Sequence, residues 1–217
     1  MKRAGRIIGA LLAGILGFLI AAAPAWAALD RTAAKVYSNR YSCNSVQCRN
    51  GAYKDFGDSD CTNFVSQTMK AGGIVQYDAF WPWQREWYYS SSTNYSGSWV
   101  GVSKFVDFML GERGATYVSP SSMSARYTPA SIGDVYMYDW GRGAGWSHLS
   151  TSPGFGTFPS YYDSTYAKNY NTVTGGTGDY LNQHSRDRYH APWNWGYWAE
   201  RDSTIRAKMK TLVVHIP

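Results

Sequence analysis

Apolar positions in the first half of the chain recur at helical spacing. Residues 29–41 mix alanine, valine and tyrosine with polar side chains, which predicts a first helix. A second helix is predicted to begin at Cys61, because apolar residues follow on one helical face and Gly72-Gly73 provides a stop. From Trp99 to Leu110 the apolar side chains follow the i, i+3, i+4, i+7, i+8 rule, which predicts a third helix.

The second half of the chain has the composition of strands and glycine turns. Residues 132–138 and 147–151 predict a hairpin around a glycine-rich turn, and residues 180–185 and 210–216 predict two further strands. The polar, glycine-rich stretch 154–178 is expected to be a long loop. Helices followed by strands with hairpin connections predict an α+β domain with an antiparallel β-sheet.

The first 27 residues have the pattern of a signal peptide. Three basic residues precede an apolar run over residues 7–23, and Ala25 and Ala27 are the small residues that a signal peptidase prefers. The run is also about long enough for a membrane anchor, but the cleavage pattern favours export. We therefore expect residues 1–27 to be removed and residues 28–217 to form one secreted, monomeric domain without stable membrane association.

Net charge and aromatic content indicate less about function than the helix, strand and signal-peptide patterns do. Removal of residues 1–27 lowers the formal net charge from +6 to +3, which suits an anionic envelope polymer but is also a common solubility feature. We expect no nucleic-acid partner. Ten Trp and eighteen Tyr predict either an aromatic-lined cleft or a core built from flat side chains. In the densest stretch, residues 76–98, Trp83 and Trp87 are candidates for a cleft wall.

The three cysteines divide into a pair and a single thiol. Cys43 and Cys48 lie in a polar, loop-like stretch, where a disulfide would close a short ring and contribute about 2 kcal/mol. Cys61 is then the odd cysteine of an exported protein. The alternative pairs Cys61 with one of the other two, but its position at a helix start favours a free thiol.

Cys61 occupies a position where a thiol ionises readily. Asp58, Ser59 and Asp60 offer capping oxygens directly before it. In the first helical turn, unpaired backbone N–H groups and the helix dipole favour negative charge, so the nucleophilic thiolate forms more easily. The alternative is a buried cysteine that serves only as a small apolar residue.

A thiol nucleophile needs a base, and histidine is suited to that task at neutral pH. His148 follows a glycine turn and begins a strand, from which its ring could project toward Cys61. His184 lies on the next predicted strand, and His215, in the terminal strand, is most simply structural. His190 is expected in a Pro/Trp-rich loop, as either a structural or a surface residue. The histidines lack HExxH spacing and the cysteines lack a CxxC, so we expect no metal or organic cofactor.

A third polar group usually orients the base. Asn182, Gln183 or His184 could supply it. Strand alternation places Asn182 and His184 on one face and Gln183 on the other, which leaves the choice open.

Several motifs occur in order from about residue 30 to the C-terminus. They are Asp60-Cys61-Thr62-Asn63-Phe64-Val65-Ser66-Gln67, Ala71-Gly72-Gly73, Ser98-Trp99, Gly133-Asp134-Val135 with Tyr138, Ser147-His148 and Gln183-His184-Ser185-Arg186-Asp187. Together they resemble the signature of the putative amidase domain family, a branch of the papain-like cysteine hydrolases related to the CHAP amidases and the NlpC-type cell-wall peptidases. The Cys43–Cys48 loop and the 154–178 insertion are not part of the signature.

The resemblance implies a papain-like α+β fold and amide hydrolysis through a thioester on Cys61. His148 would be the general base, and His184 is favoured as the residue that holds its imidazole. The backbone N–H of Cys61 would help to stabilise the oxyanion, with Tyr53 as an assisting residue. The further candidates for substrate or oxyanion contacts are Asp60, Asn182, Gln183, Trp83 and Trp87.

We therefore expect a secreted cysteine amidase or peptidase that acts on peptidoglycan stem peptides or other amides. One alternative is a non-catalytic module that binds envelope glycans with its Trp and Tyr side chains. Another is an exported cysteine enzyme that transfers acyl groups instead of hydrolysing amides.

Overall fold

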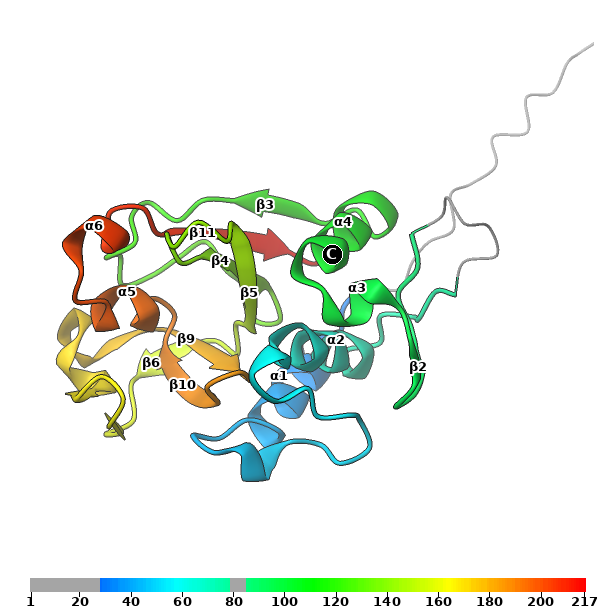
Figure 1. The fold of residues 1–217 in the computed structure, drawn as a ribbon, viewed down its shortest axis with the longest axis horizontal. Coiled ribbons are helices and arrows are strands. Elements are labelled where there is room, and N and C mark those ends of the chain that lie inside the picture. The colour runs from blue at the N-terminus through cyan, green and yellow to red at the C-terminus, as the bar shows by residue number, and fades with distance from the viewer. Residues whose placement is uncertain (1–27, 79–84) are drawn as a thin grey trace, which may run out of the picture.

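The computed structural model describes residues 28–78 and 85–217 (Figure 1). The predicted signal peptide and Trp83 lie outside these ranges. Within them, no helix is long and apolar enough to cross a membrane. The helices are α1 Arg31–Arg40, α2 Cys61–Ala71, α3 Gly97–Val100, α4 Val102–Glu112, α5 Trp195–Ala199 and α6 Ser203–Arg206. The strands are β1 Tyr89–Ser91, β2 Asn94–Tyr95, β3 Thr116–Val118, β4 Val135–Asp139, β5 Trp146–Thr151, β6 Phe155–Thr157, β7 Tyr162–Asp163, β8 Lys168–Asn169, β9 Thr177–Gln183, β10 Arg188–Pro192 and β11 Lys210–His215.

A central antiparallel sheet joins most of these strands in the order β10-β9-β5-β4-β11-β3, with β6 paired to β9. The predicted hairpin is confirmed, since β4 pairs with β5 and places Tyr138 opposite His148. The terminal strand is confirmed as well, and β11 lies between β4 and β3. The chain is therefore an α+β protein with an antiparallel sheet, as predicted.

Both faces of the sheet are covered. On β4, Val135 and Met137 face a core shared with the helices, while Tyr136 and Tyr138 face a second core. Figure 1 shows α1 to α4 gathered on one side of the molecule and the segments from β6 to α6 on the other. Both cores contain fully buried aromatic side chains: Trp87 and Trp99 in the first, and Tyr170, Trp193 and Trp195 in the second.

Helix α2 is the buried element that carries the candidate nucleophile. Its residues from Cys61 to Met69 are all buried, against α1 on one side and β5 on the other. The predicted stop is confirmed, because the helix ends at Ala71 and Gly73 takes a φ of 88°. The predicted cap is wrong in detail: Asp60 precedes the helix, but its side chain makes no capping hydrogen bond.

Three predicted segments differ from the structure. The helix expected from Trp99 to Leu110 is divided into α3 and α4, because Gly101 is extended with φ −111° and ψ 126°. The stretch 154–178 is not a plain loop, since it contains β6 and the small hairpin of β7 and β8. The loop expected around His190 forms β10. These short elements have too few residues to show a hydrophobic period.

Trp87, in the aromatic stretch before α3, belongs to the core and not to a cleft wall. Trp87 is fully buried, its indole N–H donates to Ser66 Oγ at 3.0 Å, and its ring lies 4.9 Å from that of Trp99. The prediction that Trp87 contacts substrate is therefore wrong. A ring without exposed surface stabilises the core through packing and its indole hydrogen bond, and it cannot contact a substrate.

Candidate active site

Cys61 is a free, buried thiol at the first position of α2. The other two cysteines form the predicted disulfide, Cys43–Cys48. Burial raises the pKa of Cys61, but the charge of the His148 imidazole and hydrogen bonds from His148 and the backbone of Leu149 outweigh it, lowering the pKa to about 7. The thiol is therefore substantially ionised at neutral pH, which is the condition for nucleophilic attack.

Strand β5 supplies two groups that stabilise the thiolate, and the hydroxyl of Thr62 on α2 supplies a third. Strand β5 pairs with β9 at Thr151, which lies opposite Asn182. Earlier on β5, the side chain of His148 and the backbone of Leu149 lie at the start of α2, which packs against this strand. The imidazole of His148 and the backbone N–H of Leu149 thus reach Cys61 from consecutive residues.

The orientation of His148 is fixed by Gln183 on β9. The His148 Nε2 atom lies 3.0 Å from Gln183 Oε1, and both side chains are almost fully buried. The amide nitrogen of Gln183 donates to the carbonyl of Arg186 at 3.0 Å, so its oxygen must face the imidazole. Because an amide oxygen only accepts, His148 Nε2 carries the proton and Nδ1 is left for the thiol of Cys61.

His184 does not hold His148, and this prediction is wrong. Its Nδ1 lies 2.5 Å from Asp60 Oδ2, its Nε2 lies 2.7 Å from the carbonyl oxygen of Tyr41, and its ring stacks on Phe64. Both nitrogens are occupied by acceptors, and the residue is 1% exposed. The ring therefore has neither a free lone pair nor access to substrate.

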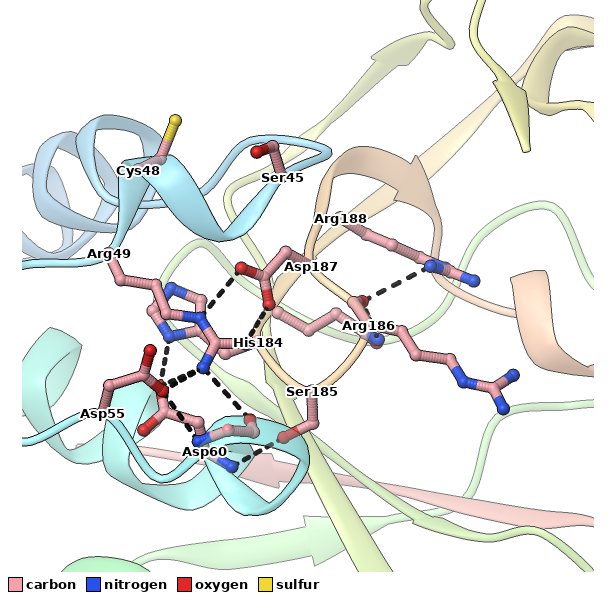
Figure 2. A network of polar contacts seen from close by, with 12 residues as sticks. Ser45, Cys48, Arg49, Asp55, Asp60, His184, Ser185, Arg186, Asp187 and Arg188 are labelled. Atoms are coloured by element: carbon pink, nitrogen blue, oxygen red, sulfur yellow. Dashed lines mark hydrogen bonds and ion pairs between the residues drawn. The ribbon is translucent and has the colours of Figure 1, made fainter. Parts of the chain in front are cut away.

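Asp60 belongs to a buried ionic network and not to a substrate site, contrary to expectation. Figure 2 shows Arg49 between Asp55, Asp60 and Asp187, with a bidentate pair of 2.9 and 2.6 Å to Asp187. The backbone N–H of Asp60 donates to Ser185 Oγ at 2.7 Å. This network ties the residue before Cys61 to the turn that follows Gln183.

Asn182 is also structural, which corrects its prediction as a site residue. Its amide donates to Asn39 Oδ1 at 2.8 Å, and its oxygen accepts from the His190 backbone N–H at 2.9 Å. These contacts join β9 to α1 and β10. Burial lowers the pKa of His190 to about 4, and His215 pairs with Asp134 at 2.6 Å, so both histidines contribute to packing.

Tyr53 lies in the aromatic cluster around α3. Its ring stacks on Trp99 with centroids 5.9 Å apart and tilts against Tyr89 at 5.0 Å. Burial raises its pKa, so the phenol remains a neutral donor. Its assistance at an oxyanion stays a prediction.

A cavity of about 740 Å³ opens beside the candidate pair, with His148 and Gln183 in its wall. Cys61, which is 7% exposed, is not in that wall. Within the described residues, no three His, Cys, Asp or Glu side chains are grouped to hold a metal ion. The aromatic and charged residues of the wall are Trp140, Tyr166, Trp195, Asp58, Arg142, Arg186, Arg188, Glu200 and Arg201.

Most of this wall was missed by sequence reasoning. Two motifs gave a usable signal: Ser147-His148, which contains the candidate base, and Gln183-His184-Ser185-Arg186-Asp187, which contains the orienting residue and a cavity arginine. Tyr166 lies in the stretch expected to be a loop, and Trp195 and Arg201 lie in segments without a clear period. Their proximity depends on contacts between distant parts of the chain.

Comparison with known proteins gives first the class and then the family. Residues 28–208 match the family described as "Putative amidase domain", a class of amidase-like hydrolases. The chain belongs to this family, which confirms the predicted resemblance. Its relation to CHAP and NlpC enzymes stays a prediction.

One curated relative is "Uncharacterized protein YjcM" of Bacillus subtilis (strain 168). It is 32% identical over 108 residues, a match that covers 50% of this chain and 22% of that protein. The matched region is therefore only about a fifth of the relative. No solved structure matches the chain significantly, so the papain-like geometry also stays a prediction.

Proposed function

We propose that this protein is a cysteine amidase or peptidase that cleaves amide bonds through a thioester on Cys61. Membership of the amidase domain family supports amide hydrolysis. The cysteine mechanism rests on the contacts that link three side chains in series, Cys61 to His148 and His148 to Gln183. In this series a thiol with a pKa of about 7 faces an oriented imidazole. A papain-like fold, which the family resemblance implies, would bring a helix start and a strand together in this way.

In the proposed reaction, the Cys61 thiolate attacks the amide carbonyl carbon and pushes the electron pair onto oxygen. The backbone N–H of Cys61, at the positive end of α2, stabilises this oxyanion. His148 then donates its Nδ1 proton to the leaving amine as the C–N bond breaks. A water, deprotonated by His148, attacks the thioester, which releases the carboxylic acid and restores the thiolate.

We further propose that the protein is secreted and acts on peptidoglycan stem peptides or other amides of the cell envelope. The signal-peptide pattern of residues 1–27 supports export. The Cys43–Cys48 disulfide also supports an oxidising compartment. Mass spectrometry of the culture medium tests this, and a mature chain beginning at Ala28 is the expected result.

Alkylation of Cys61 by iodoacetamide across pH tests the mechanism without a known substrate. The disulfide blocks the other two cysteines, so the measured rate belongs to Cys61 alone. Because the pKa is lowered, the rate should reach half its maximum at about pH 7, well below the roughly 8.5 of a free thiol.

The variants give the alkylation profile its meaning. His148→Ala should move the midpoint upward, whereas His215→Asn, a change at a histidine paired with Asp134, should leave it unchanged. A wild-type midpoint near 8.5 contradicts the proposal. So does a profile that His148→Ala leaves unaltered.

Cleavage of purified peptidoglycan is the second test. Wild-type protein should release new amines, and Cys61→Ala should release none while still binding the polymer. Binding without any cleavage by the wild type would instead favour a glycan-binding module, to which the Trp140 and Tyr166 wall of the cavity would then be assigned. Transfer of the acyl group to an added amine instead of to water would favour an acyltransferase.

A further inference from the structure

The cavity beside His148 carries an excess of arginine. Its wall contains four arginines but only two carboxylates. These are Arg142, Arg186, Arg188 and Arg201 against Asp58 and Glu200. The mild net charge of the whole chain does not account for such a local excess, so the arrangement points to what the cavity binds.

Two of the four arginines are neutralised by neighbouring carboxylates. Arg142 pairs with Glu200, and Arg188 pairs with Asp163 at 2.8 Å. An arginine already paired in this way has little net attraction left for an anionic ligand. These two residues are therefore better explained as parts of the cavity wall.

The other two arginines have no carboxylate partner among the described residues. Arg186 donates to the hydroxyl of Tyr166, and its guanidinium also lies 5.7 Å from the centre of that ring. This contact restrains the side chain without neutralising its charge. Arg201 is exposed and has no polar partner in the described part of the chain. Asp58 is the one wall carboxylate left to face them.

Arg186 is placed close to the candidate pair by the turn after β9. It is three residues from Gln183, and its own carbonyl accepts the hydrogen bond that orients the Gln183 amide. Figure 2 shows the guanidinium groups of Arg186 and Arg188 pointing away from the network of Arg49 and Asp60. The free charge is therefore presented on the cavity side, near the end of the chain Cys61–His148–Gln183.

We propose that Arg186 and Arg201 bind a carboxylate of the substrate, so that the preferred substrates are acidic peptides. A guanidinium fork matches a carboxylate with two parallel hydrogen bonds, and the Tyr166 contact restrains the Arg186 fork for such a pair. The inference rests on the proposed function in that it takes this cavity as the substrate site. It adds the chemical class of substrate and two specificity-determining residues.

Binding to the Cys61→Ala variant of the full chain tests the inference without requiring chemistry. The probes are acetylated tripeptide pairs: Glu against Gln at the central position of a peptide amide, and a free against an amidated C-terminus. Calorimetry should show at least one acidic peptide binding about five- to tenfold more tightly than its neutral partner. The preference should shrink as salt is raised.

Substitution of each arginine shows which residue causes the preference for acidic peptides. In the Cys61→Ala background, Arg186→Ala and Arg201→Ala should each bring the acidic-to-neutral ratio toward one, and Arg186→Lys should give an intermediate ratio because it keeps the charge without the fork. Arg85→Ala is the matched control, since Arg85 is an exposed arginine outside the cavity wall that pairs with Glu112. It should leave the ratio unchanged.

Two results overturn the inference: ratios near one for both peptide pairs, or a preference that Arg186→Ala and Arg201→Ala both leave intact. Circular dichroism confirms that each variant is folded before binding is measured. Failure of the proposed function is seen separately, as a normal thiol titration and no amide cleavage by the wild type. The binding ratios are independent of that outcome.

Discussion

Two histidine clusters contact the start of α2, one at Cys61 and one at Asp60, and only the first can serve a reaction. His148 contacts Gln183 and lines the cavity, whereas His184 contacts Asp60 and is sealed from solvent. Gln183, which orients His148 in the first cluster, directly precedes His184 of the second cluster in the sequence. Residue type and sequence position therefore do not distinguish the reactive histidine from the structural one. Their contacts and solvent exposure do.

The difference lies in the number of free ring nitrogens. His148 uses Nε2 to contact Gln183, which leaves Nδ1 for a proton transfer with Cys61. His184 has an acceptor at each nitrogen, the Asp60 carboxylate and the Tyr41 carbonyl. A general base needs one nitrogen with an available lone pair beside the reacting proton. A fully bonded ring acts instead as a structural cross-link.

The sealed cluster nevertheless supports the reactive one. Arg49 follows Cys48 directly and joins the disulfide loop to Asp187 after β9. The same network reaches Asp60, the residue before Cys61. It thereby holds the start of α2 against the turn that carries the orienting glutamine. We describe Asp60, His184 and Arg49 as positioning residues for this reason.

Replacing each histidine with alanine separates the two roles most clearly. His148→Ala should lower kcat/KM for amide cleavage by about 10²- to 10⁴-fold, the usual contribution of a general base. The free energy of unfolding should change much less. Activity is measured on peptidoglycan and normalised to the folded fraction. If His184→Ala lowers the normalised activity equally, the assignment of His148 as the base is wrong.

His184→Ala should instead lower stability, by about 3 kcal/mol, because it leaves the Asp60 carboxylate buried without its closest partner. Urea unfolding followed by circular dichroism measures the loss. His215→Ala is the control: the side chain of His215 is 33% exposed, and its partner Asp134 keeps Arg31 at 3.0 Å. That change should cost about 1 kcal/mol or less. Equal losses for the two variants would contradict a special role for the buried pair.

Gln183→Ala should reduce kcat by about 10- to 100-fold with little change in KM, because the His148 imidazole loses its preferred orientation. The alkylation midpoint of Cys61 should also move, which a purely structural role would not produce. Gln183→Asn serves as the shorter control that keeps the amide. An unchanged kcat and midpoint in Gln183→Ala would leave the orienting role without support.

Removing the disulfide is expected to lower stability less than His184→Ala does. Cys43→Ser with Cys48→Ser should lower the free energy of unfolding by about 2 kcal/mol, since the bond closes only a short ring. Urea unfolding of the wild type with and without reductant provides the matched comparison. A loss larger than that of His184→Ala would show that the loop, and not the buried ion pair, dominates the positioning of α2.

Much of the framework was predictable because it depends on short-range order. The helix beginning at Cys61, the β4–β5 hairpin and the Cys43–Cys48 bridge each involve residues close in sequence. Even the alternation along β9 was correct: the Asn182 and His184 side chains reach the α1 side, and Gln183 faces the other way. His184 was favoured over Gln183 because alternation does not show which face of β9 lies toward His148.

The sequence alone favoured a free thiol at a helix start and determined a histidine near a strand start and the α+β class, because periodicity, turn residues and cysteine spacing are local properties. Only the tertiary structure decided that Gln183 orients the base, that Trp87 is core and that four arginines share a cavity. Those facts depend on how β9 lies beside β5 and α2, and on segments more than 40 residues apart, such as those of Arg142 and Arg186. Such contacts are set by packing of the whole chain.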